Sequence, residues 1–158
     1  STSAYYLPAA QLLDQGMTLE LLLSPMDEPS ADAVGYLFAR TELNITTWVH
    51  KRLVDVGVLS NLDWINPVRM PPAFSQDFRV IGRSEDVPRA LMLMRTGLAP
   101  NVQARLQQVL LDAARDPDAG EALRRFMGTA HFVPITDADK QVLQRLGRDV
   151  RRVNTEVE

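Results

Sequence analysis

The segment from Val34 to Asn44, VGYLFARTELN, carries the pattern that decides the fold. Its first six residues form a short apolar run typical of a buried strand, and helical periodicity begins at Glu42. Thr41 precedes that helix, and threonine is a common helix N-cap. The segment therefore predicts a strand over 34–39 that turns directly into a helix over 42–53.

A related pattern occurs on both sides of this segment. The residues VDVGVL predict a strand over 54–59 that is apolar apart from Asp55, as in a buried parallel strand, and one or two helical turns over 60–65 follow. Before the segment, a helix over 4–15 leads into a strand over 18–24. Because strands alternate with helices, we expect an α/β fold whose neighbouring strands are parallel.

The second half of the chain is expected to be mainly helical. Two further strands are predicted over 78–83 and 90–95, followed by helices over 101–115 and 118–127. A last helix begins at Thr136, and acidic residues in its first turn complement the helix dipole. Apolar faces are predicted for two of these helices, formed by Val102, Leu106, Val109, Leu110 and Ala113 in one and by Ala138, Val142, Leu146, Val150 and Val153 in the other.

Composition excludes several classes of protein. The 158 residues are 46% hydrophobic and 23% charged, which indicates a folded domain rather than a disordered chain. The net charge is −3, so binding to nucleic acid is not expected. There is no cysteine for a disulfide or a thiolate site. The first residues lack the basic and apolar regions of a signal peptide.

Three helix starts carry short polar side chains that suit an anion. Ser1, Thr2 and Ser3 precede the first helix, where amide N–H groups, the helix dipole and hydroxyl groups all favour negative charge. Thr41 and the pair Ser60-Asn61 lie at two strand-to-helix junctions, which share one edge of a parallel sheet. The alternative is that all three are ordinary helix caps, and the sequence leaves both interpretations open.

No motif for catalysis, metal binding or a cofactor is found. The two histidines, His50 and His131, lack metal-ligating neighbours at helical spacing. No GxSxG, P-loop or GxGxxG pattern occurs. We therefore expect a protein that is not an enzyme, with no metal and no cofactor.

Five segments occur in an order that resembles a known family. They are STSAYYLPAAQLL, VGYLFARTELN, HKRLVDVGVLSNLDW, FRVIGRSEDVPRALMLMR and PNVQARLQQVLLDAARDPDAGEALRRF. Together they resemble the phosphate, phosphite and phosphonate type of periplasmic solute-binding protein of ABC transporters. The resemblance covers nearly the whole chain.

The resemblance implies a type II fold with two α/β lobes and a ligand held between them. Residues 1–83 would form the second lobe, a three-layer α/β/α structure that lacks its leading strand. Residues 84–158 would form a crossover strand and C-terminal helices that pack on the first lobe, which is absent. A chain of this kind is expected to be a fragment and to expose association-prone surfaces, so a homodimer is one expected state.

The resemblance also assigns binding residues. Ser1, Thr2 and Ser3 match the family's Ser-Thr-Ser motif for phosphonate oxygens. Thr41 stands where phosphonate binders usually have histidine, and Ser60 or Asn61 stands where an acidic residue can hold a ligand amine. Arg89 would add a contact to the anion or serve as a hinge salt-bridge residue. The oxyanion half of the site is thus kept, whereas the amine-binding half is lost.

The implied function is the capture of a small oxyanion in the periplasm for an ABC transporter permease. A ligand-sensing domain of a signalling protein with the same fold is the alternative. An enzyme on a related two-lobe fold is a third interpretation, and the absence of a base–nucleophile pair argues against it.

Overall fold

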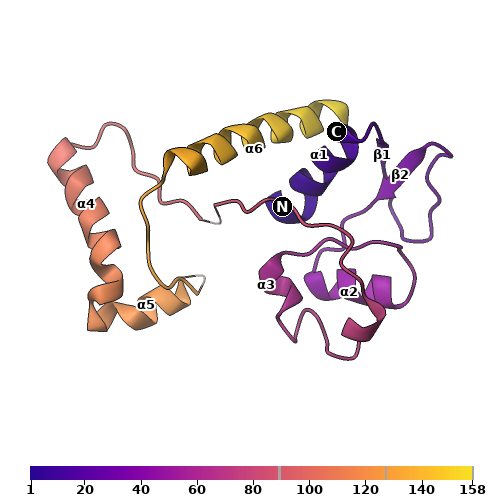
Figure 1. Cartoon of the computed structure of the whole chain (residues 1–158), viewed down its shortest axis with the longest axis horizontal. Coiled ribbons are helices and arrows are strands. Elements are labelled where there is room, and N and C mark those ends of the chain that lie inside the picture. The colour runs from indigo at the N-terminus through magenta and orange to yellow at the C-terminus, as the bar shows by residue number, and fades with distance from the viewer. Residues whose placement is uncertain (89, 127, 158) are drawn as a thin grey trace. The chain divides into compact units, whose positions relative to one another are not determined.

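The computed structural model describes residues 1–88, 90–126 and 128–157, and it contains a small parallel sheet and a larger number of helices (Figure 1). The described residues divide into two compact units, residues 1–86 with 144–158 and residues 87–143. None of the described helices is both long and apolar enough to cross a bilayer.

In the first unit, β1 (Thr18–Leu21) pairs with β2 (Ala33–Tyr36) in parallel, with Thr18 opposite Ala33 and Leu21 opposite Tyr36. Both predicted strands are confirmed, although they are shorter than expected. The amide groups of Leu23 and Ser24 donate to the Asp27 carboxylate at 3.1 and 2.9 Å. These two bonds fold the chain into a turn, which ends β1 before Pro25.

The predicted first helix starts differently from expectation. A π-helical segment, η1 (Thr2–Tyr6), precedes α1 (Leu7–Asp14), and the Tyr6 amide reaches back to the Ser1 carbonyl at 3.2 Å. The wider turn shifts the start of the α-helical register, so that Pro8 falls in the first turn of α1, where its missing N–H costs little. Gly16, with a φ of 77°, lies just beyond the helix end as predicted.

Two further helices of the first unit follow the sheet. The helix α2 (Glu42–His50) is shorter than the predicted 42–53, because Arg52 adopts a left-handed φ of 58° that ends it. The amide of Leu53 then donates to the Trp48 carbonyl at 2.9 Å and closes the C-terminus. The short helix α3 (Asn61–Trp64) confirms the helical turn predicted over 60–65.

The three other predicted strands are wrong for the described residues. Segments 54–59, 78–83 and 90–95 are irregular, and none of them pairs with another described segment. A strand requires a hydrogen-bonding neighbour, and the only pairing within the described ranges is that of β1 with β2. Gly57 nevertheless lies against α2, because a Cβ built on it would be 2.6 Å from Ile45 Cγ2. The segment 54–59 therefore contacts α2 at Gly57, although Val56 is exposed.

The core of the first unit lies between α1, the sheet and the end of α6 (Asp137–Glu156). Val153 is fully buried among Tyr5, Ala9 and Ala10, and Tyr36 and Leu19 pack against this cluster. Arg152 on α6 pairs with Asp14 at the end of α1. The predicted apolar stripe of the last helix is confirmed at Val153, and this packing fixes the position of α1 (Figure 1).

The second unit contains α4 (Pro100–Asp112), η3 (Ala113–Arg115), η4 (Pro117–Ala119) and α5 (Gly120–Arg125). The predicted apolar face of α4 exists but stays half-exposed at Val102, Leu106 and Val109. The start of α6 also belongs to this unit, and Thr136 and Asp139 cap it with reciprocal hydrogen bonds. A short 3-10 turn, η2 (Ser75–Asp77), completes the elements of the described chain.

Candidate functional site

The start of η1 offers hydrogen-bond donors that the fold itself does not use. The Ser1 hydroxyl caps the turn by accepting from the Ala4 amide at 3.4 Å. Among the described residues, the hydroxyl groups of Thr2 and Ser3 have no hydrogen-bond partner. Their amide groups belong to the first turn, where N–H groups have no partner within the helix. Two hydroxyl and two amide donors are therefore free at this end of the helix.

Aromatic contacts bring this end of the helix to the carboxyl end of β2. The ring of Tyr5 lies 5.6 Å from that of Tyr36, the last residue of β2, and 5.0 Å from that of Phe38. In a parallel sheet, ligands bind at the carboxyl ends of the strands. The first predicted group of residues, Ser1 to Ser3, thus starts a helix whose first turn packs at the edge where the sequence predicted a site.

The other two helix starts are tied to each other by Arg69. Its guanidinium pairs with Asp63 on α3 and lies 3.9 Å from the Glu42 carboxylate in the first turn of α2. Thr46 on α2 is 1% exposed and donates its hydroxyl to the Arg69 carbonyl at 2.8 Å. The N-terminal turns of α2 and α3 therefore form one connected cluster.

Within this cluster, the predicted hydroxyl groups act first as caps. The Thr41 hydroxyl accepts from the Asn44 amide at 3.2 Å, which leaves its proton available to a ligand. The Ser60 hydroxyl both accepts from the Asp63 amide at 3.1 Å and donates to the Asp63 carboxylate at 2.7 Å. Asn61 is exposed and makes no side-chain hydrogen bond within the described chain. Arg89 lies outside the described residues, so its role stays a prediction from the sequence.

The carboxyl group of Asp63 has a shifted pKa. Partial burial raises the pKa, but the hydrogen bonds from Ser60 and the hydrogen bond and charge of Arg69 outweigh it. The net effect holds the pKa of Asp63 below its ordinary value. Asp63 therefore stays ionised, and it neutralises much of the Arg69 charge beside the two helix starts.

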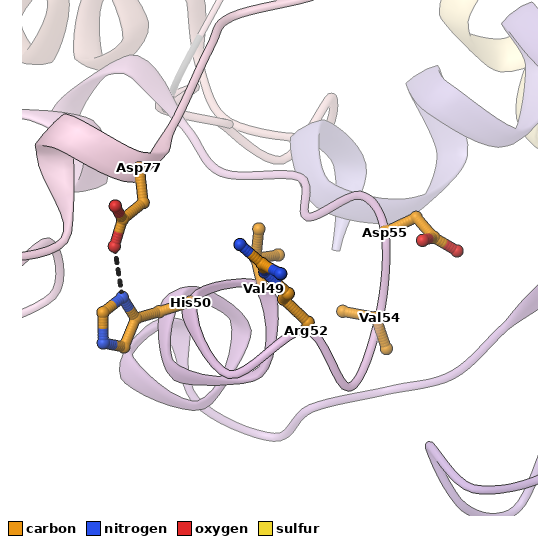
Figure 2. A pocket seen from close by; sticks show the side chains of 6 residues that line it. All are labelled: Val49, His50, Arg52, Val54, Asp55 and Asp77. Atoms are coloured by element: carbon orange, nitrogen blue, oxygen red, sulfur yellow. Dashed lines mark hydrogen bonds and ion pairs between the residues drawn. The ribbon is translucent and has the colours of Figure 1, made fainter.

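A pocket that the sequence did not predict lies at the other end of α2 (Figure 2). It has a volume of about 360 Å³ and is lined by Val49, His50, Arg52, Val54, Asp55 and Asp77. The His50 Nδ1 atom lies 2.8 Å from Asp77 Oδ2, and the His50 ring stacks on Phe74 with centroids 4.0 Å apart. Asp77 and Phe74 come 27 and 24 residues later in the chain, so no local spacing could have revealed them. The described residues contain no group of three His, Cys, Asp or Glu side chains able to hold a metal.

Comparison with known proteins identifies the family to which this chain belongs. The family model for the phosphonate periplasmic substrate-binding protein of ABC transporters matches residues 1–140. The chain belongs to this family, which confirms the resemblance found in the sequence. It is thus a member of a family of transport substrate-binding proteins.

Two solved structures match this chain, and both are of XAC2383 from Xanthomonas citri. The structure bound to chloride ion is 46% identical in sequence, has a TM-score of 0.91, and is matched over 99% of this chain and 56% of its own. The structure bound to ATP is 47% identical, with a TM-score of 0.91, and is matched over 100% of this chain and 57% of its own. This chain therefore spans little more than half the length of XAC2383.

Proposed function

We propose that this chain is part of a substrate-binding protein that captures a small oxyanion of the phosphate, phosphite or phosphonate class for an ABC transporter. The ligand is held without being chemically changed, and its release to a permease follows. The protein works in the periplasm, as its family does. The free donors of Thr2 and Ser3, on a turn whose Tyr5 ring packs beside Tyr36 at the end of β2, are the observation that carries this proposal.

The donors suit an oxyanion for electrostatic and geometric reasons. Hydrogen bonds from amide and hydroxyl groups to a charged oxygen are stronger than bonds between neutral groups. The start of a helix adds the positive end of its dipole. Chloride and ATP, the molecules in the two XAC2383 structures, are both anionic, which supports the same preference here.

We assign the remaining ligand contacts to those predicted residues whose side chains have a free hydrogen-bond donor. Thr41 has a free hydroxyl proton, and Asn61 has a free amide, so both can donate to ligand oxygens. Ser60 has its proton committed to Asp63, so its role is to support α3 rather than to bind the ligand.

The rest of the ligand site belongs to the part of the protein that this chain does not span. We propose that this part supplies the first lobe and the leading strand of the second lobe. A three-layer α/β/α lobe then forms, and the C-terminal helices pack on the first lobe. Closure of two lobes over the ligand would remove water and strengthen each hydrogen bond.

A titration followed by NMR tests the proposal on the chain itself. Methylphosphonate and inorganic phosphate are added to the ¹⁵N-labelled chain, and the amide signals of Thr2 and Ser3 are followed. We expect these signals to shift in a saturable way. Replacing both residues (Thr2→Ala with Ser3→Ala) should weaken binding at least ~10-fold, since hydrogen bonds to charged groups contribute roughly 1.5–3 kcal/mol each.

The matched control is Ser75→Ala, which removes an exposed hydroxyl at the start of η2, outside the proposed site. Its affinity for both anions should equal that of the unchanged chain. Equal affinity in the Thr2 and Ser3 variant, or shifts confined to the pocket at His50, would contradict the proposed site.

A further inference from the structure

Phe38 is a large aromatic residue whose side chain the fold leaves exposed. It lies two residues beyond Tyr36, where β2 ends, and it is 55% exposed. Side chains two residues apart on an extended chain point to the same face. Phe38 therefore lies on the same face as Tyr36, just past the end of the strand. Its ring thus lies at the edge of the sheet where parallel strands receive ligands.

Two aromatic neighbours hold the exposed ring in place. The Phe38 ring meets Tyr5 with centroids 5.0 Å apart at 66° and Tyr36 with centroids 5.8 Å apart at 89°. Both contacts have the edge-to-face geometry that aromatic pairs favour. Because Tyr5 is buried, with 7% exposure, this support is rigid. Ordering the ring on a ligand would therefore cost little conformational entropy.

The same Tyr5 links the ring to the donors proposed to bind the anion. The Tyr5 amide donates to the Ser1 carbonyl at 3.1 Å, so Tyr5 belongs to the turn that begins with Thr2 and Ser3. Tyr5 therefore joins the two features, because its ring contacts Phe38 and its main chain belongs to the turn that begins with Thr2 and Ser3.

We propose that Phe38 selects the ligand's substituent, so that the preferred ligand is a phosphonate or phosphate monoester with a planar apolar group rather than an inorganic oxyanion. This inference rests on the proposed function, because it needs the anionic group to bind at Thr2 and Ser3. The planar group packs on the exposed ring and removes both surfaces from water.

The test compares two probes that share the anionic group. Phenylphosphonate and methylphosphonate are titrated separately into the ¹⁵N-labelled chain, and into its Phe38→Ala and Phe38→Leu variants. The unchanged chain should bind phenylphosphonate roughly 3- to 10-fold more tightly, as expected for one aromatic contact. Nuclear Overhauser effects should link the phenyl protons of the probe to the Phe38 ring.

Phe38→Ala should remove the preference while leaving the affinity for methylphosphonate unchanged. Phe38→Leu keeps an apolar side chain that supports Tyr5, so it serves as the folded variant if alanine disturbs the fold. It should lose most of the preference. Circular dichroism of each variant identifies any loss of structure.

Each outcome has one meaning. Equal affinity of the unchanged chain for both probes, or a preference that survives in Phe38→Leu, overturns the inference about Phe38 but leaves the anion site standing. No shift at Thr2 and Ser3 with either probe overturns the proposed function, and this inference with it.

Discussion

The hydroxyl of Thr46 donates a hydrogen bond to the main-chain carbonyl of Arg69 at 2.8 Å, although the two residues are 23 positions apart. Thr46 is 1% exposed, so no solvent competes for this bond. The bond joins α2 to the loop after α3. The side chain of Arg69, the residue whose carbonyl accepts this bond, pairs with Asp63 on α3. One backbone contact thus positions the cation that connects the two helix starts.

Replacing Thr46 should destabilise the first unit. Thr46→Val keeps the shape but removes the donor, so the carbonyl of Arg69 loses its bond from the buried Thr46 hydroxyl. We expect a loss of roughly 1–3 kcal/mol in the free energy of unfolding, measured by urea denaturation. Thr46→Ser keeps the hydroxyl and should lose clearly less. If valine and serine were equally stable, the hydrogen bond would not be the cause.

A second prediction concerns the close contact between Gly57 and α2. Gly57→Val would place side-chain carbons where Ile45 and Val49 already lie, with the first of them 2.6 Å from Ile45 Cγ2. We expect a loss of about 1–3 kcal/mol, because overpacking forces neighbouring atoms apart. Gly82→Val is the matched control, since no atom lies within 4 Å of a Cβ at that position. A similar loss in both variants would mean that the contact with α2 is not responsible.

The third prediction concerns the pH dependence of stability. The pKa of Asp63 is lowered in the folded chain, from a reference value of 3.8, so its ionised form stabilises the fold above that value. This contribution should disappear as the pH falls from about 5 through the lowered pKa. In Asp63→Asn, the midpoint of urea denaturation should fall less steeply between about pH 5 and pH 2. An unchanged acid slope in this variant would contradict the assignment.

The fourth prediction tests the packing of α6 on α1. Val153 is fully buried, and Val153→Ala should cost roughly 2 kcal/mol through lost burial and a small cavity. Val133 is 68% exposed, so Val133→Ala should change stability by less than about 0.5 kcal/mol. Thermal unfolding followed by circular dichroism measures both. A small effect at Val153 would show that α6 does not cover the core in solution.

The sequence predicted those features that depend on neighbouring residues. The caps at Thr41, Ser60 and Thr136 follow from local hydrogen bonding, and the helix at 100–112 follows from its periodic apolar face. The strands at 18–21 and 33–36 were also found, because both have a partner within the chain.

Features that depend on distant partners were missed. The apolar run at 54–59 has the composition of a strand, but composition does not supply the neighbouring strand that it needs. The π-helical turn at Thr2–Tyr6 differs from an α-helix by one residue of hydrogen-bond register, which side-chain periodicity does not reveal over five residues. The pairing of His50 with Asp77 depends on a chain reversal that no motif marks.

The ion pair between Asp14 and Arg152 also has a consequence for folding kinetics, because 138 positions separate the two residues. Tyr5 and Ala9 are buried in part by Val153. The core around α1 therefore forms only when a contact of very high sequence separation is made. Closing so long a loop is slow compared with forming the sheet of β1 and β2. During synthesis, α1 would leave the ribosome many seconds before Val153, at roughly 5–20 residues per second. Until Val153 packs, the apolar face of α1 stays in contact with water, so the core of this unit is expected to form only after the end of α6 is in place.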